Sequence, residues 1–284
     1  MFLIIAKIYA RLQKFLHDIP KINLPGFGVI LSQIKRDYII NYGKNKLYFN
    51  HKVARAYGRL ISGIFNEPET HLFIKRLINK IDFKINFIDV GASVGEFVID
   101  MAGYDKVNSI FAFEPIYEAY KSIQVSCIIN DFKHVKVFNQ VLSEDGKPLA
   151  FFYDKKSPMG SKIFQEQKNN LQKYMIDSTT LDLHFSNLEE PSILLIDVEG
   201  AELSVLKGGR NFTRNNFPLI IFEYNEVSKK YFDLEDIQIV LGKNYKIYRL
   251  KSDGYLDENY GDTWNMVAVH SSSSFFSAVI SMVK

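Results

Sequence analysis

The chain has 284 residues, of which 47% are hydrophobic, and a formal net charge of +3 at pH 7. This hydrophobic content suffices for a packed core, and the even spread of Lys and Arg along the sequence indicates no nucleic-acid partner. One cysteine and six scattered histidines exclude an intramolecular disulfide, predict no metal site and favour a reduced, cytoplasmic compartment.

Residues 1–16 have the pattern of a basic amphipathic helix. Its apolar face consists of Ile5, Ile8, Leu12, Phe15 and Leu16, and the bases Lys7, Arg11 and Lys14 lie elsewhere. The pattern has two interpretations. One is weak contact with an anionic membrane surface, which would place the protein at the inner face of the membrane. The other is packing of this helix on the protein's own core. No apolar run reaches about 18 residues, so no transmembrane helix is predicted.

Residues 1–80 are expected to form a mainly helical N-terminal extension. Glu67 and Pro68 begin a helical run that continues to Lys80, with the acids first and the bases later, as the helix dipole favours. We expect the main domain to cover residues 81–270 and residues 271–284 to form a C-terminal tail that frays.

Strands and helices alternate after residue 81. The predicted strands are 86–90, 109–114, 135–142, 192–197, 219–224, 245–250 and 264–270, and the predicted helices are 95–102, 116–130, 201–207 and 234–241. This alternation predicts an α/β fold, Rossmann-like and doubly wound, with a mostly parallel seven-stranded sheet. The last two strands have no helix between them, so we expect an antiparallel pair at one edge. The polar segment 151–177 is expected to lie over the site as a loop or lid.

A two-glycine turn follows the first predicted strand of the domain. Asp89 lies at the end of that strand, and Gly91, Ser93 and Gly95 lead into a helix. A glycine here permits positive φ and lets a ligand approach the backbone. The spacing differs from the Gly-x-Gly-x-x-Gly of dinucleotide sites and lacks the lysine of triphosphate sites, so both ligand types are disfavoured.

Glu114 ends the next predicted strand. It follows Gly91 by about the interval at which an acid binds ribose hydroxyls in Rossmann units, and a carboxylate can accept two hydrogen bonds from a vicinal diol. The alternative is that Glu114 caps the helix that begins near Pro115.

Three further acids follow buried strands. Asp197 and Glu199 come at the end of the strand 192–197, and Glu223 ends the strand 219–224. Because parallel strands of an open α/β sheet bind ligands at their carboxyl ends, we expect these acids to converge on one crevice. Glu202 would lie in the first turn of the next helix, where its negative charge interacts favourably with the helix dipole. Lys207-Gly208 has the pattern of a helix C-cap.

These segments, in this order, resemble the FkbM-type methyltransferases over roughly residues 85–225. The matching motifs are Val90-Gly91-Ala92-Ser93-Val94-Gly95-Glu96-Phe97, Phe113-Glu114-Pro115, Leu142-Ser143, Thr180-Leu181-Asp182, Ile196-Asp197-Val198-Glu199-Gly200-Ala201-Glu202-Leu203 and Leu206-Lys207-Gly208. The resemblance implies a class I fold that uses S-adenosylmethionine, and O-methylation of a sugar hydroxyl in a glycan or of a secondary metabolite. The chain departs from the family at Ser93, where Asn is usual, and at Leu195, where Lys is usual.

The resemblance gives each candidate residue a role toward S-adenosylmethionine. Asp89 would bind the ammonium, the backbone from Gly91 through Ser93 to Gly95 would bind the carboxylate, and Glu114 would bind the ribose. Leu142 and Ser143 would flank the adenine.

A carboxylate is expected to take the proton of the acceptor hydroxyl. Asp197 or Glu199 is the candidate base, with Glu223 in reserve. The same acids could instead bind substrate hydroxyls without taking a proton. Two other functions stay open, namely an NAD-dependent oxidoreductase and a non-catalytic methyltransferase-like scaffold. The sequence identifies neither the acceptor, a small molecule or glycan, nor the oligomeric state.

Overall fold

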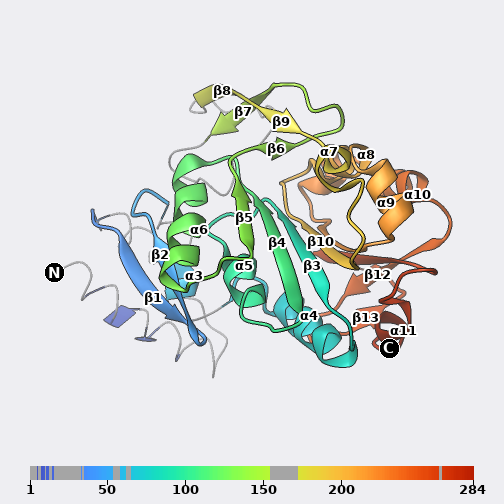
Figure 1. Cartoon of the computed structure of the whole chain (residues 1–284), viewed down its shortest axis with the longest axis horizontal. Coiled ribbons are helices and arrows are strands. Elements are labelled where there is room, and N and C mark those ends of the chain that lie inside the picture. The colour runs from blue at the N-terminus through green and yellow to red at the C-terminus, as the bar shows by residue number, and fades with distance from the viewer. Residues whose placement is uncertain are drawn as a thin grey trace.

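The computed structural model describes residues 35–53, 58–61, 65–153, 172–261 and 264–284, together with residues 5, 8, 9, 11, 12, 15 and 33. An eight-stranded sheet forms its centre, in the order β13-β12-β14-β11-β10-β3-β4-β5 (Figure 1). The strands are β3 Ile85–Val90, β4 Val107–Phe113, β5 Val135–Phe138, β10 Ser192–Ile196, β11 Leu219–Glu223, β12 Tyr245–Leu250, β13 Leu256–Asp257 and β14 Asn265–His270.

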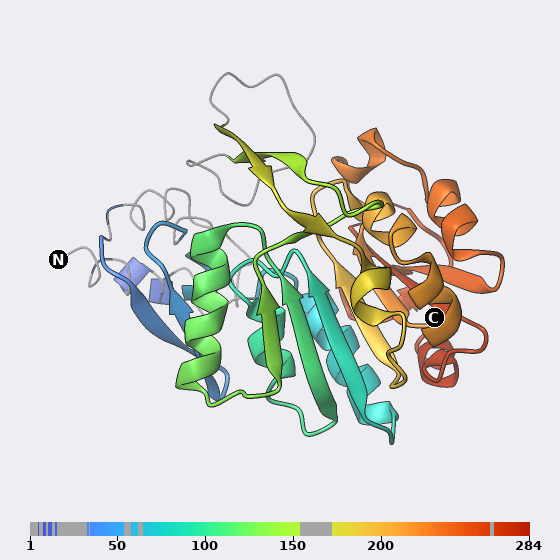
Figure 2. The ribbon, with the colours of Figure 1, turned by 45° about the horizontal axis from the view of Figure 1, so that its top comes forward.

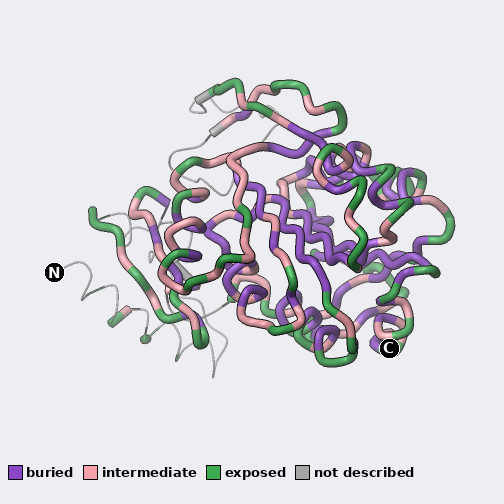
Figure 3. The backbone as a smooth tube through the Cα atoms, in the orientation of Figure 1, coloured by how far each residue is buried: buried purple, intermediate pink, exposed green. Residues whose placement is uncertain are grey.

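The predicted mixed sheet is confirmed. The five strands β5, β4, β3, β10 and β11 are parallel neighbours, and β14 then pairs antiparallel with both β11 and β12. The sheet has eight strands instead of the predicted seven because the two-residue strand β13 pairs with the end of β12. Every residue of β3, β10 and β11 is buried, as their continuous apolar runs predicted (Figure 3).

Helices cover both faces of the sheet, and the sheet separates two hydrophobic clusters, one on each face. Helices α4 Pro68–Lys80, α5 Glu96–Met101, α6 Tyr117–Ile129 and α11 Phe276–Ile280 contribute to the first cluster. Helices α7 Leu181–Phe185, α8 Glu202–Lys207, α9 Arg210–Asn216 and α10 Leu234–Leu241 contribute to the second. Strand β3 serves both clusters, because Phe87 packs in the first and Ile88 in the second.

Two small β-pairs follow β5 near the carboxyl end of the sheet. Strand β6 Val141–Leu142 pairs with β9 Ser178–Thr179, and β7 Leu149–Tyr153 pairs antiparallel with β8 Gln172–Ile176 (Figure 2). The expected loop over 151–177 is therefore wrong at both ends, where the backbone forms strands. The centre of that segment lies outside the described residues.

The N-terminal section contains a β-hairpin that the sequence did not predict. Strands β1 Tyr38–Tyr42 and β2 Asn45–Phe49 pair antiparallel, and the short helix α3 Gly58–Ile61 precedes α4. The hairpin is joined to the helices of the main domain, since Asn45 Nδ2 donates to the Ile99 carbonyl at 2.9 Å and the Tyr48 amide donates to Ser126 Oγ at 2.9 Å.

Only six residues of the predicted helix 1–16 are described, and all six are helical. Their apolar side chains Ile5, Ile8, Leu12 and Phe15 are exposed. Among the residues with an assigned structure, no helix has the length and apolarity needed to cross a membrane.

The expected fraying of residues 271–284 is wrong. Phe275, Val279 and Met282 are fully buried in the first cluster; Val279 belongs to α11, and the other two lie just before and just after this helix. The backbone continues this packing, because the Leu256 amide donates to the Met282 carbonyl and the Lys284 amide donates to the Leu256 carbonyl, both at 2.9 Å.

Candidate active site

The crevice of interest lies at the carboxyl ends of β4, β3, β10 and β11. From β3 the chain passes to β4 on one side, while β10 joins β3 from the other side, so the connections diverge here. In open α/β sheets this divergence opens the crevice where ligands bind. Asp89 lies beside Leu195 in the β3–β10 register. Ile196, just before Asp197, lies beside Phe222, just before Glu223.

Gly91 holds two of these strand ends together. Its φ is +88°, and a Cβ at this position would overlap the backbone carbonyl oxygen of Asp197. The glycine therefore satisfies two needs, a left-handed backbone and close packing against the end of β10. The turn and the Asp197 segment, which are far apart in the sequence, form one structural unit.

Glu114 fixes the other end of the turn. Its Oε2 accepts from the Ser93 amide at 2.7 Å and its Oε1 from the Ile116 amide at 2.6 Å. Burial raises the pKa of Glu114 to about 8, although these two backbone hydrogen bonds lower it. Ser93 has a φ of 56°, a conformation that Asn adopts readily, so the usual family residue would fit here as well. Glu114 thus anchors the start of α6, and its ribose role stays a prediction.

Asp89 is a buried carboxylate without a complete set of partners. It is 3% exposed, and its Oδ2 accepts no hydrogen bond. Burial raises the pKa of Asp89 to about 8, and the charges of Glu67 and Glu114 add to the increase. A ligand ammonium at Oδ2 would supply the missing donor.

Asp197 and Glu223 form a pair at the ends of neighbouring strands. Burial raises the pKa of Asp197 well above its ordinary value, with the Glu223 charge as the next cause. Burial also raises the pKa of Glu223 to about 8, and a hydrogen bond with Asp197 opposes the increase. Glu223 Oε2 has no hydrogen-bond partner. Two such carboxyls in contact share a proton more easily than both ionise.

The other two acids of the Asp197 segment have different surroundings. Glu199 has a left-handed φ of 55° in the turn after β10. Glu202 is fully buried, and its Oε1 accepts from the Val198 amide at 3.2 Å and the Gly200 amide at 3.1 Å. Glu202 therefore shapes the turn that presents Asp197 and Glu199.

Leu142 and Ser143 lie on the β5 side of the crevice. Leu142 is part of the second hydrophobic cluster, and Ser143 Oγ bonds to Ser178 Oγ at 2.8 Å and accepts from the Gly146 amide at 3.1 Å. Their contact with adenine stays a prediction. Gly208 packs directly on Ser143, because a Cβ there would overlap the Ser143 carbonyl oxygen. Its φ is −75°, so close packing explains this glycine better than a left-handed C-cap does.

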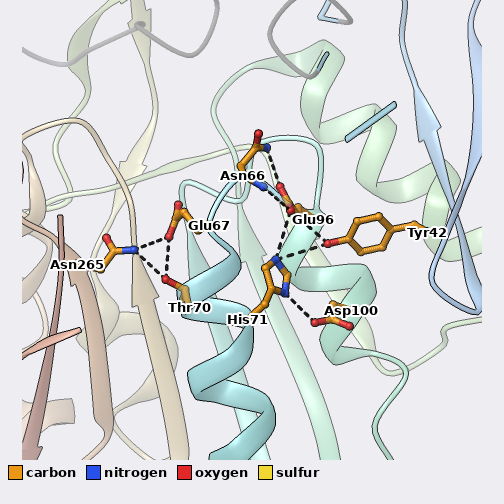
Figure 4. Close-up of polar contacts among 8 residues, drawn as sticks. All are labelled: Tyr42, Asn66, Glu67, Thr70, His71, Glu96, Asp100 and Asn265. Atoms are coloured by element: carbon orange, nitrogen blue, oxygen red, sulfur yellow. Dashed lines mark hydrogen bonds and ion pairs between the residues drawn. The ribbon is translucent and has the colours of Figure 1, made fainter. Parts of the chain in front are cut away.

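Sequence reasoning missed a polar network at the start of α4 (Figure 4). Glu67, the N-cap residue, accepts from Asn265 Nδ2 at 2.6 Å and from Thr70 Oγ1 at 3.1 Å through the same oxygen, Oε2. Its charge acts on Asp89, Asp197 and Glu223, so Glu67 belongs to the crevice. The Glu-Pro dipeptide indicated only the start of a helix.

A second part of this network joins the N-terminal hairpin to α5. His71 Nδ1 lies 2.8 Å from Asp100 Oδ2, and its Nε2 lies 3.3 Å from Glu96 Oε1. Glu96 also accepts from the Asn66 amide and side chain, at 3.1 and 2.7 Å. Burial lowers the pKa of His71, but its hydrogen bonds and the charges of Asp100 and Glu96 outweigh burial and raise it to about 9.

Among the described residues, no group of three or more His, Cys, Asp or Glu side chains is arranged to hold a metal ion.

The sheet order and the position of the crevice define a Rossmann-like class I methyltransferase fold. A family model, the methyltransferase FkbM domain, matches residues 89–250. That match covers more than half of the sequence, so the chain belongs to the FkbM methyltransferase family, as its motifs predicted. The family and fold are those of S-adenosylmethionine-dependent methyltransferases.

Two curated fungal proteins are similar to part of the chain. Methyltransferase 1 of Beauveria bassiana (strain ARSEF 2860) is 25% identical over 141 residues, which are 43% of this chain and 57% of that protein. Methyltransferase sdnD of Sordaria araneosa is 28% identical over 152 residues, which are 43% of this chain and 59% of that protein. The chain thus matches less than two thirds of the length of either relative.

Among solved structures, the methyltransferase FkbM of Methylobacillus flagellatus KT aligns with 76% of this chain and 54% of its own. The identity is 18% and the TM-score is 0.46.

Proposed function

We propose that this protein is an S-adenosylmethionine-dependent O-methyltransferase whose acceptor is a hydroxyl of a sugar in a glycan or of a secondary metabolite. The observation that carries the proposal is the Asp197–Glu223 pair beside the glycine turn of a family methyltransferase fold. A hydroxyl is a weak nucleophile until its proton is removed, and a carboxyl with a pKa near neutrality is suited to that task.

The residues present fit the methyl donor, which supplies an activated methyl group when bound. Asp89 offers an unpartnered oxygen, Oδ2, to an ammonium. Glu114 already fixes the glycine turn through Ser93, and each of its oxygens keeps a lone pair for a ribose hydroxyl. The amides of Gly91, Ser93 and Gly95 already donate to the Phe113 carbonyl, Glu114 Oε2 and the Ala92 carbonyl, so these residues would position the donor by close backbone approach and not through free amides.

The proposed base is Asp197, acting with Glu223. Asp197 is only partly buried, so it faces the open crevice, whereas Glu223 lies deeper at 7% exposure. A proton taken by Asp197 from the acceptor hydroxyl would be shared with the Glu223 carboxylate. Glu199 stays the alternative base, because it lies in the same turn.

The acceptor side has an exposed aromatic residue. Trp264 is 58% exposed and directly precedes Asn265, which pairs with Glu223 across β14 and β11. An exposed indole next to the strand pair that holds Glu223 suits a sugar ring, because the ring's C–H face can pack on the aromatic face. This arrangement supports a sugar acceptor over an extended apolar one.

The decisive experiment combines donor binding with turnover. The purified chain is titrated calorimetrically with S-adenosylhomocysteine and with NAD, and then incubated with S-adenosylmethionine and a panel of sugars, glycans and polyols. We expect binding of S-adenosylhomocysteine and the mass increase of one methyl substitution on a hydroxylated acceptor. Binding of NAD alone would favour the oxidoreductase alternative, and S-adenosylhomocysteine binding without turnover on any acceptor would favour the scaffold.

We also propose that residues 1–16 make a weak contact with anionic membranes. The exposure of Ile8, Leu12 and Phe15 supports this interpretation over packing on the core. Vesicles of anionic lipid should sediment the full chain more strongly than a chain without its first 17 residues. Equal sedimentation of the two would refute the membrane contact.

A further inference from the structure

Glu67 brings a third carboxylate to the Asp197–Glu223 pair from outside the family domain. It precedes the matched residues 89–250, and its Oε2 is fixed by Asn265 and Thr70 (Figure 4). Asn265 lies 198 residues further along the chain and opposite Glu223 in the β11–β14 register. Two distant segments are thus tied together where the three acids meet. We call Glu67, Asp197 and Glu223 the acidic cluster.

Within the part of the chain that the structure describes, no basic side chain is among the main influences on the acidic cluster. The main influences on the pKa values of its three carboxyls are burial, hydrogen bonds and other carboxylates. The nearby His71 is engaged with Glu96 and Asp100. Like charges so close together are unfavourable unless a proton or a ligand cation neutralises them.

Three buried carboxylate oxygens in or near this cluster lack partners: one on Glu223, one on Asp89 and one on Glu202, whose other oxygen accepts two backbone amides. Glu223 is 7% exposed and its Oε2 accepts no hydrogen bond, and the same holds for Oδ2 of Asp89, which is 3% exposed. Buried carboxylate oxygens are nearly always satisfied in folded proteins, so the unpartnered oxygens of Glu223 and Asp89 indicate a ligand. A ligand with positive charge suits these oxygens, because the charges that act on Glu223 are those of other carboxylates, and the one base that acts on Asp89, His71, is already paired with Glu96 and Asp100.

The order of the strands indicates which part of the ligand meets the cluster. Glu114 is on β4, on one side of the glycine turn, whereas Asp197 and Glu223 are on β10 and β11, on the other side. If the ribose binds at Glu114, the group attached to its 5′ carbon extends across β3 toward the acidic cluster. In S-adenosylmethionine that group is the positively charged sulfonium.

We propose that the acidic cluster binds the sulfonium charge, so that the protein prefers the cationic methyl donor over the neutral product. This inference rests on the proposed function. During transfer the bond between sulfur and the methyl carbon breaks, its electron pair stays on sulfur, and the methyl carbon bonds to the acceptor oxygen. The hydroxyl proton passes to Asp197. The sulfur loses its positive charge, and the acidic cluster loses one negative charge when Asp197 takes the proton. The electrostatic attraction that binds S-adenosylmethionine is therefore absent for S-adenosylhomocysteine.

The test measures affinities, not turnover. Calorimetry with the full chain gives the dissociation constants of S-adenosylmethionine, S-adenosylhomocysteine and sinefungin, which has a protonated amine in place of the methyl sulfonium. At about pH 8, near the raised pKa of Glu223, both cationic ligands should bind about tenfold more tightly than S-adenosylhomocysteine.

Substitutions test whether the preference for cationic ligands depends on the acidic cluster. Glu67→Gln should reduce the preference for the cationic ligands to about threefold or less, with the affinity for S-adenosylhomocysteine nearly unchanged. Glu67→Asp should retain most of the preference. Glu69→Gln is the control, because it removes the same charge two residues away, in the first turn of α4, and should retain most of the preference. If Glu67→Gln does not fold, Glu223→Gln tests the cluster from β11 and should show the same loss.

Equal affinities of the wild-type chain for S-adenosylmethionine and S-adenosylhomocysteine would overturn this inference and leave the proposed function intact. An equal loss for all three ligands in Glu67→Gln would also overturn it, because Glu67 would then act only through the fold. A wild-type chain that binds none of the three would refute the proposed function as well.

Discussion

The two sides of the crevice differ in how their carboxylates are satisfied. On the β4 side, both oxygens of Glu114 accept backbone amides from nearby residues, Ser93 and Ile116. On the β10–β11 side, Asp197 and Glu223 share a hydrogen bond, the charge of Glu67 acts on both, and Glu223 Oε2 has no partner. The first side is complete without a ligand and suits a neutral diol. The second side is complete only when a cation or a proton is bound.

The largest expected effect is on the incomplete side. Asp197→Asn should lower kcat by about 10²–10⁴-fold, because it removes the proposed base. Affinity for the neutral S-adenosylhomocysteine should change little, and this measurement shows that the variant is folded. A loss below about tenfold, roughly 1.4 kcal/mol, would exclude an essential base at Asp197. A larger loss in Glu199→Gln would assign the role to Glu199.

Gly91 joins the two sides, so its substitution should disturb both. Gly91→Ala places a Cβ at φ +88° and against the Asp197 carbonyl oxygen. Gly43→Ala is the control, because Gly43 has a φ of +57° and no atom within 4 Å of an added Cβ. Both should lose about 1–2 kcal/mol for the left-handed backbone, and Gly91→Ala should lose roughly 1–3 kcal/mol more from overlap. Denaturant unfolding measures the free energy of unfolding of both variants. Equal losses would mean that the end of β10 moves away from the added Cβ without loss of stability.

Glu114→Gln tests the complete side. Its amide group replaces one accepting oxygen, so a diol and two backbone amides can no longer all be satisfied. We expect affinity to fall about tenfold, roughly 1.4 kcal/mol, for S-adenosylmethionine and S-adenosylhomocysteine alike. The equal loss distinguishes Glu114 from Glu67. Glu118→Gln is the control, since Glu118 pairs only with the exposed Lys52. Unchanged affinity in Glu114→Gln would leave Glu114 as a helix cap alone.

Stability without ligand should fall as the pH rises. Asp89, Glu114 and Glu223 have pKa values near 8 in the folded state, above those of an unfolded chain, because burial disfavours their charge. The folded state thus binds more protons between about pH 4 and 8. His71, with its pKa raised to about 9, contributes stability below about pH 6.5 that is lost as the pH passes 9.

The three carboxyls and His71 therefore all lower the free energy of unfolding as the pH rises. The free energy of unfolding should drop by at least about 1.4 kcal/mol from about pH 6 to pH 8.5, the equivalent of one pKa unit. Denaturant titrations at the two pH values measure it, and Asp89→Asn should flatten the slope. A free energy of unfolding that rises with pH would contradict the assignment.

The smallest effect concerns the acceptor. Trp264→Ala should raise KM for a sugar acceptor roughly threefold to tenfold, about 1 kcal/mol, with kcat nearly unchanged, and Trp264→Phe should restore most of the loss. Trp264 is the single tryptophan of the chain, so acceptor binding should also change its intrinsic fluorescence. If no acceptor that the enzyme methylates changes the fluorescence spectrum, Trp264 does not belong to the acceptor site.

The features predictable from the sequence are those with a local signal. Continuous apolar runs located β3, β4, β10 and β11, and the acids at their ends meet because parallel strands end at one edge. Helices α5, α6, α8 and α10 also lie within the predicted ranges.

The missed features depend on contacts between distant residues. No local pattern shows that Glu67 reaches Asn265, or that Gly208 is a glycine because the Ser143 carbonyl occupies the space of a side chain. The buried C-terminal residues Phe275, Val279 and Met282 looked like a tail, because a short helix has little signal without the surface on which it packs.

The bond between Glu67 and Asn265 has a consequence for synthesis on the ribosome. The strands β3, β4, β10 and β11 emerge in order, yet Glu67 cannot be fixed until residue 265 has left the exit tunnel. The first hydrophobic cluster, in which α4 lies, also waits for Phe275, Val279 and Met282. A nascent chain would therefore form the glycine turn well before it fixes Glu67, the residue that we propose helps to discriminate the methyl donor from its product.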